Sequence, residues 1–199
     1  MRDEVRRDRD QSAADFVRIV WPVVQQHCPE LRGSVLRLVE GRANEVIAQD
    51  LDVCAGIDSY QCTPSGLRGI ASRVQWWKNY HTFTVRVSRP GGALTEYRKR
   101  LITLKRRHEG FFYPYWTIQA YVSEPGGTLL AVAVAKTLEL YRYIEQRTLC
   151  GRPCPERPAG KGGERFLFVE WGEYQQSGYY LFVHIASDPC TAPASPDGR

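Results

Sequence analysis

The pattern of hydrophobic and polar positions divides the chain into a helical start and a longer region dominated by strands. Residues 12–28 carry apolar side chains at helical spacing, and Pro22 predicts a kink or an early break in this helix. From residue 45 onward, apolar and β-branched runs favour strands over 45–61 and 68–77. Residues 63–66 between these two strands predict a Pro/Gly turn.

Further strands and two more helices follow in the second half of the chain. Thr95 is the predicted N-cap of a helix over 95–107, in which Leu101 and Leu104 face inward. Residues 129–146 begin as a strand and end as a helix. The alternation of polar and apolar residues over 82–87 predicts a half-buried strand, and apolar runs predict strands over 111–122, 166–171 and 179–185. The last two of these predict a terminal antiparallel hairpin spanning 166–185.

This order of elements predicts an α/β or α+β fold with a central mixed β-sheet flanked by helices. We expect one globular domain over residues 12–186, between a disordered arm at 1–11 and a disordered tail at 187–199. The polar segment 148–164 is expected to be a loop. The first residues are charged and lack an apolar stretch, so we expect no secretory signal and a cytoplasmic location.

The charge of the chain permits nucleic-acid binding without requiring it. The net charge is +5, and cations crowd the predicted helix over 95–107. They are Arg98, Lys99, Arg100, Lys105, Arg106 and Arg107. A solvated helix face and a phosphate-binding surface both fit this cluster. The six cysteines and four histidines show no zinc-site spacing, and we expect the cysteines to be free thiols. The chain contains no G-x-S-x-G, P-loop or dinucleotide-binding motif.

Polar residues within two apolar strands are the strongest indication of a site. Asp58 interrupts the first strand, and Arg73 and Gln75 interrupt the second. Burying a charged side chain without a partner is costly. The pattern therefore predicts either a functional site or an internal ion pair between Asp58 and Arg73.

The layout of residues 12–122 resembles the PD-(D/E)XK nuclease-like superfamily. In that superfamily a helix precedes a strand that bears Asp and a second strand that bears Glu/Gln-x-Lys. The resemblance implies a restriction-endonuclease-like core and Mg²⁺-dependent cleavage of nucleic acid, DNA more than RNA. It implies that Asp58 binds the metal, that Gln75 completes the site, and that Arg73 or Lys78 contacts phosphate or water.

The second strand departs from the family pattern, which leaves several hypotheses open. Lys78 follows Gln75 by three residues, so it reaches the same strand face only through a β-bulge. In some members the acid comes from the next helix, where Glu96 is the candidate second metal ligand. A non-catalytic module of the same fold would instead bind nucleic acid, a protein partner or a second copy, the latter two through the 166–185 hairpin. An unrelated α+β enzyme has no motif in its favour.

Two adjacent tryptophans give one more candidate for a nucleic-acid contact. Trp76 and Trp77 point to opposite faces if both lie in a strand, so one ring is expected to be exposed. Beside the cations, Trp77 is a candidate for stacking on nucleic-acid bases. The alternative is ordinary packing within the sheet, where aromatic residues are favoured.

Overall fold

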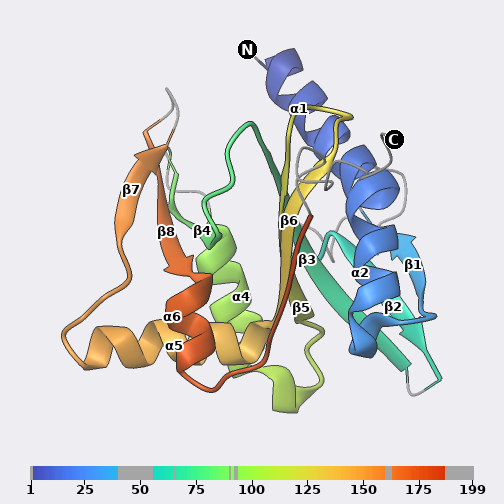
Figure 1. The fold of residues 1–199 in the computed structure, drawn as a ribbon. Helices are drawn as coiled ribbons and strands as arrows, with labels where there is room; N and C mark the ends of the chain where they lie inside the picture. The colour runs from blue at the N-terminus through green and yellow to red at the C-terminus, as the bar shows by residue number, and fades with distance from the viewer. Residues whose placement is uncertain are drawn as a thin grey trace, which may run out of the picture.

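The protein folds into three layers around a central β-sheet (Figure 1). The computed structural model describes residues 2–39, 56–64, 66–89, 91, 94–159 and 163–186 of the 199. The N-terminal helices cover one face of the sheet, while three helices and a smaller sheet lie on the other. The predicted mixed α/β architecture with flanking helices is therefore confirmed. Within the described residues, none of the helices is long and apolar enough to cross a membrane.

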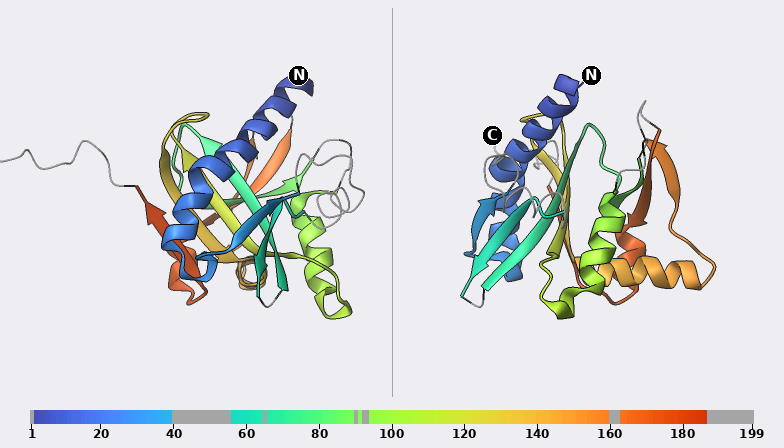
Figure 2. Two further views of the ribbon diagram at one scale, coloured as in Figure 1. Left: turned by 90° about the vertical axis from the view of Figure 1, so that its right-hand side faces the viewer. Right: turned by 180° about the vertical axis from the view of Figure 1, so that it is seen from behind.

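The central sheet has six strands, of which only one neighbouring pair is parallel. Its order is β1-β2-β3-β5-β6-β9, with β3 and β5 parallel and the other neighbours antiparallel. Its strands are β1 (Val35–Leu38), β2 (Ser59–Thr63), β3 (Gly66–Trp76), β5 (Pro114–Val122), β6 (Leu129–Lys136) and β9 (Leu181–Ile185). The second sheet, seen beside the first in Figure 2, has the order β4-β8-β7. Its strands are β4 (Thr82–Ser88), β8 (Glu164–Glu170) and β7 (Glu156–Ala159).

The N-terminal helical region begins at Arg2, well before the predicted start at residue 12. It consists of α1 (Arg2–Asp15), the π-helical turn η1 (Phe16–Val20) and α2 (Trp21–His27), followed by the 3₁₀ turn η2 (Pro29–Leu31). Pro22 is the second residue of α2 and has no backbone N–H to donate. The Trp21 N–H bonds to the Phe16 carbonyl, five residues back, which is the irregularity expected beside a proline.

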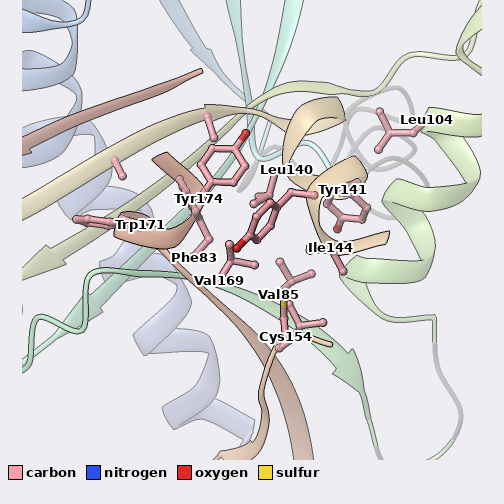
Figure 3. Close-up of a cluster of buried hydrophobic side chains, with 14 of the residues drawn as sticks. Phe83, Val85, Leu104, Leu140, Tyr141, Ile144, Cys154, Val169, Trp171 and Tyr174 are labelled. Atoms are coloured by element: carbon pink, nitrogen blue, oxygen red, sulfur yellow. The ribbon is translucent and has the colours of Figure 1, made fainter. Parts of the chain in front are cut away.

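The two faces of the central sheet carry separate apolar cores because side chains alternate along each strand. On β5, Trp116, Ile118 and Ala120 face the N-terminal helices. Tyr121, the next residue after Ala120, points the other way and faces the opposite core. Most of the labelled side chains in Figure 3 come from α5 (Thr137–Leu149), α6 (Trp171–Gln176), β4 and β8, and form this second core.

The helix α4 (Glu96–Lys105) lies beside β4 and is followed by the 3₁₀ turn η5 (Arg107–Glu109). Its start agrees with the prediction, because the Thr95 side chain accepts a hydrogen bond from the Arg98 N–H. Leu104 is buried and Leu101 packs against the second core, as predicted. The helix therefore presents its remaining residues to the neighbouring strands and to solvent.

The predicted terminal hairpin is wrong. β8 pairs with β4 and β7 in the smaller sheet, whereas β9 pairs with β6 in the central sheet. Between them, Trp171 and Tyr174 are buried three residues apart, which is the spacing of one helix face, and α6 forms there. The hairpin that was predicted to bind a partner or a second copy therefore does not form. β7 lies inside the predicted loop, and residues 45–55 and 187–199 lie outside the described residues.

Candidate functional site

The predicted site lies where β2, β3, β4 and the start of α4 meet, on the face of the central sheet opposite the N-terminal helices. Asp58 directly precedes β2, and its backbone N–H bonds to the Ile70 carbonyl on β3. Its carboxylate accepts the Ser72 backbone N–H at 2.6 Å and the Ser72 hydroxyl at 3.4 Å. The carboxylate of Asp58 thus continues the hydrogen bonding between β2 and β3.

Arg73 pairs with Glu96, and not with Asp58. Arg73 Nη2 donates to Glu96 Oε1 at 2.6 Å and to Oε2 at 2.7 Å, and the two side chains are 21% and 26% exposed. The Arg73 guanidinium also lies 4.9 Å from the centre of the Phe166 ring on β8. The predicted Asp58–Arg73 ion pair is therefore wrong, and the internal ion pair joins β3 to the first residue of α4.

Arg100 places a second positive charge against the same carboxylates. It is 6% exposed, and its Nε atom has no hydrogen-bond partner within the described residues. Burial disfavours its charged form, but Tyr141, Glu96 and Asp58 nearby raise its pKa above the ordinary value. Burial also raises the pKa of Glu96, but Arg73 and Arg100 lower it by more, so its pKa lies below the ordinary value. Both groups are therefore charged at neutral pH.

Gln75 belongs to a chain of amide and hydroxyl contacts between the two sheets. Its Oε1 atom accepts a hydrogen bond from Gln119 Nε2 on β5 at 3.1 Å. Gln119 Oε1 in turn accepts the Thr84 N–H at 3.3 Å and the Thr84 hydroxyl at 2.9 Å, on β4. Next to this chain, the Tyr121 hydroxyl donates to the Thr82 carbonyl at 2.8 Å. These polar groups join the central sheet to β4.

The side chains that the resemblance assigns to Mg²⁺ are engaged by other groups of the protein in this arrangement. A hard cation requires oxygen atoms that are free to face it. Both Glu96 oxygens face Arg73, the Gln75 oxygen faces Gln119, and the guanidinium of Arg100 lies near Asp58 and Glu96. Among the described residues, no three His, Cys, Asp or Glu side chains gather to hold a metal.

The six predicted nucleic-acid contacts of the α4 region separate into exposed and buried side chains. Arg98, Lys105, Arg106 and Arg107 are exposed, and Lys99 is half-buried. Arg100 is buried in the network with Glu96, so it is not part of the cationic surface predicted for it. Arg106 pairs with Glu109 at 2.9 Å and lies 3.7 Å from the centre of the Phe111 ring. Arg98 and Lys105 have no ion-pair partner within the part of the chain that the structure describes.

A shallow groove of about 140 Å³ opens between α4 and α5, next to this surface. Its lining combines an apolar base with a cationic border. The residues are Leu101, Leu104, Lys105, Arg107, Leu138, Tyr141, Arg142 and Glu145. Arg142 is exposed and, like Lys105, makes no ion pair among the described residues. Three cations therefore face this groove against one carboxylate.

Trp77 and Lys78 lie away from the network, in the connection from β3 to β4. Pairing between β3 and β5 is regular from Ile70 to Trp76, so no bulge brings Lys78 beside Gln75. Trp77 is 67% exposed with φ of 79°, and the Lys78 N–H bonds to the Trp76 carbonyl at 3.0 Å. This is a γ-turn of the rare, strained kind, and such a backbone costs on the order of 1–3 kcal/mol. Of the two tryptophans, Trp77 is the exposed ring.

Sequence reasoning missed three residues of the network, although two of them left a signal. Gln119 interrupts the apolar run of β5 just as Arg73 and Gln75 interrupt β3. Arg100 precedes Leu104 by four residues and so lies on the inward face of α4. Thr84 looked like the solvent side of a half-buried strand, but β4 is buried on both faces there.

The geometry thus distinguishes a neutralised polar network, a cationic surface on α4 and α5, and a strained aromatic turn. None of these features could be interpreted through a relative of known activity. Comparison of the chain with protein-family models, with curated protein sequences and with solved structures found no match.

Proposed function

We propose that this protein binds nucleic acid through the cationic surface formed by α4, η5 and the adjoining part of α5. The observation that carries the proposal is that Arg98, Lys105 and Arg142 are exposed without an ion-pair partner within the described residues. A cation that lies beside a carboxylate is already neutralised and has less charge to offer a ligand. Partnerless cations around a groove instead supply the contacts that a phosphate backbone needs.

The balance of charge in this region supports the proposal. Residues 96–109 contain six cations and two carboxylates, Glu96 and Glu109. Glu96 is held by Arg73 inside the fold, and Glu109 is paired with Arg106. The excess positive charge is therefore presented outward, where it attracts a polyanion over roughly a Debye length of about 8 Å at physiological salt.

The arrangement of Asp58, Arg73 and Glu96 favours binding over cleavage. Each carboxylate is engaged by a protein donor, and two guanidinium groups balance the two negative charges. We propose that the six-stranded sheet is a variant of the restriction-endonuclease-like core in which this network replaces the metal site. The antiparallel β2–β3 pair that carries Asp58 and Gln75, preceded by a helical region, supports this part of the proposal.

Metal-dependent phosphodiester cleavage is the second candidate, and one observation favours it. Asp58 and Glu96 both lie close enough to Arg100 to raise its pKa, so the two acids share one region of the fold. Cleavage would require Glu96 to leave Arg73 when nucleic acid binds. This candidate is tested with single- and double-stranded DNA and RNA in Mg²⁺ or Mn²⁺. Cleavage that Asp58→Ala abolishes and Asp8→Ala does not would establish it in place of pure binding.

The binding proposal is tested by the anisotropy of a fluorescent 20-base-pair DNA duplex, titrated with the full chain at several salt concentrations. We expect affinity to fall steeply with salt, with a slope of about 0.9 per phosphate contact. The triple variant Arg98→Gln, Lys105→Gln, Arg142→Gln should reduce that slope by about 2–3 and weaken binding at least tenfold.

A matched control separates this surface from general charge. Arg18, Arg32 and Arg37 are exposed on η1, directly after η2 and on β1, outside the elements that form the proposed surface. Changing these three to Gln removes the same net charge. If both triple variants weaken binding equally, the attraction is non-specific and the proposed surface is wrong.

A further inference from the structure

The connection between β3 and β4 presents two aromatic rings and a cation to solvent. Trp77 is 67% exposed and Tyr80 is 56% exposed. Lys78 between them is exposed and makes no ion pair within the described residues. Trp77 and His81 are the two non-glycine residues with positive φ in the described chain, at 79° and 50°. A bulky residue held in this conformation and exposed to water calls for an explanation outside folding.

Contacts on both sides hold the turn in this shape. The Trp76 indole Nε1 donates to Asp15 Oδ2 at 2.8 Å, and Asp15 is 2% exposed. The Trp77 N–H bonds to the Val122 carbonyl at 3.1 Å, so the backbone is fixed where Trp77 turns outward. At the other end, the Trp171 N–H bonds to the His81 carbonyl at 2.9 Å. The Tyr80 ring lies 6.2 Å from the Tyr121 ring, edge to face.

We propose that this turn, residues 77–80, binds the unpaired bases of single-stranded nucleic acid. The proposal rests on the function proposed above and names the form of nucleic acid that the turn recognises. A base offers a flat π-face to an exposed ring, and its phosphate offers a negative charge to Lys78. Bases within a duplex are already stacked on their neighbours, so only an unpaired or terminal base is free to stack on Trp77 or Tyr80. A backbone that is fixed before binding loses little freedom when a base stacks on the rings that it carries.

The turn is separate from the cationic surface of α4. From Arg73, β3 continues for four residues to reach Trp77, which is roughly 13 Å. From Glu96, the partner of Arg73, α4 runs the other way for nine residues to Lys105, which is roughly 14 Å. In Figure 1 the connection from β3 to β4 lies at the top and the end of α4 at the bottom. Substitutions in one place therefore leave the other intact.

Tryptophan fluorescence provides a direct readout, because Trp77 is much the most exposed of the five tryptophans. Trp21, Trp116 and Trp171 are 6%, 1% and 3% exposed, and Trp76 is half-buried against Asp15. The full chain is titrated with a ten-residue oligothymidylate, the matching oligouridylate and a blunt hairpin duplex. We expect the single strands to quench the emission and the duplex to quench it little. The two strands show whether DNA or RNA is preferred.

The variants decide the inference. Trp77→Ala should weaken single-strand binding about tenfold, while Trp77→Phe should keep most of the affinity and lose the quenching. Lys78→Gln should reduce the salt slope for the single strand by about one. Duplex affinity should not change in any of the three. If Trp77→Ala leaves single-strand affinity unchanged while the triple variant of Arg98, Lys105 and Arg142 loses duplex binding, this inference fails and the proposed function stands. If the wild-type chain binds neither strand nor duplex, the proposed function fails as well.

Discussion

Replacing Glu96 by Gln tests whether the polar network stabilises the fold or holds open a metal site. The substitution keeps the shape of the side chain and removes the charge that faces Arg73 at 2.6 and 2.7 Å. Arg73 would then lose its ion-pair partner, and the buried Arg100 would keep Asp58 as a nearby carboxylate. If the network is structural, the variant is destabilised. If Glu96 is held for a metal, removal of one of two neighbouring negative charges stabilises the protein without metal.

The size of the expected loss can be estimated from the contacts. A hydrogen bond to a charged group contributes about 1.5–3 kcal/mol net, and an acid in the first turn of a helix adds about 0.3–1 kcal/mol. Because Gln still accepts one hydrogen bond, we expect a loss of about 2–3 kcal/mol in the free energy of unfolding. In a chain of this length each kcal/mol shifts Tm by about 2–4 °C, so Tm should fall by roughly 5–10 °C.

The control is Glu109→Gln, which removes the same charge from the exposed pair with Arg106. Those two side chains are 45% and 48% exposed, and such pairs contribute about 0–1 kcal/mol. Thermal unfolding followed by circular dichroism compares the two variants at pH 7. A Tm for Glu96→Gln at or above that of the wild type would refute the reasoning. Stabilisation of the wild type alone by Mg²⁺ would then favour the metal site.

The pH dependence of the same variant provides a second check with a definite sign. The folded pKa of Glu96 lies below its ordinary value of 4.5, because Arg73 and Arg100 outweigh the effect of burial. As pH falls, the unfolded chain therefore binds the proton first. The advantage of the wild type over Glu96→Gln is complete above the ordinary pKa and disappears as pH falls through the folded pKa. A difference that does not shrink as pH falls below 4.5 would contradict this assignment.

Other single side chains carry effects that thermal unfolding can measure in the same way. Gln119→Ala leaves the Thr84 N–H without its partner inside the fold, and we expect a loss of about 2–3 kcal/mol; an unchanged Tm would show that water replaces the amide. Asp15→Ala removes the acceptor of the Trp76 indole, and should lower Tm and alter the near-ultraviolet circular dichroism. Trp77→Gly relieves the positive φ and should stabilise the fold by about 1 kcal/mol while weakening single-strand binding; a lower Tm would refute the argument from strain.

Local patterns predicted the elements well where the pattern and the cap agreed. The alternation over 82–87 corresponds to β4 (Thr82–Ser88), and the predicted strand over 68–77 corresponds to β3 (Gly66–Trp76). Thr95 caps α4 because its side chain can reach the Arg98 N–H whatever the rest of the fold does. These outcomes depend on residues within a few positions of each other, and the sequence contains that information directly.

The choice of partners between distant elements could not be predicted in this way. Two apolar runs separated by a short polar segment favour a hairpin, but Trp171 and Tyr174 bury their rings on one side of a helix instead. β8 and β9 then join different sheets. The partner of Arg73 was misassigned for the same reason. The sequence placed Asp58 and Arg73 on neighbouring predicted strands. Glu96 lies opposite Arg73 only because α4 packs beside β4, which no local pattern indicates.

The position of each charge on α4 separates stability from binding. Arg100 faces inward and balances Asp58 and Glu96, while Arg98 and Lys105 face solvent on the same helix. A polyanion that contacts the outer face does not need to disturb the inner network. Stability and duplex affinity should therefore vary independently. Glu96→Gln changes the stability, and the triple variant of Arg98, Lys105 and Arg142 changes the duplex affinity. A metal-dependent nuclease would couple them, because the same carboxylates would then serve the substrate. The independence of the two measurements is thus the property that separates a binding module from an enzyme on this fold.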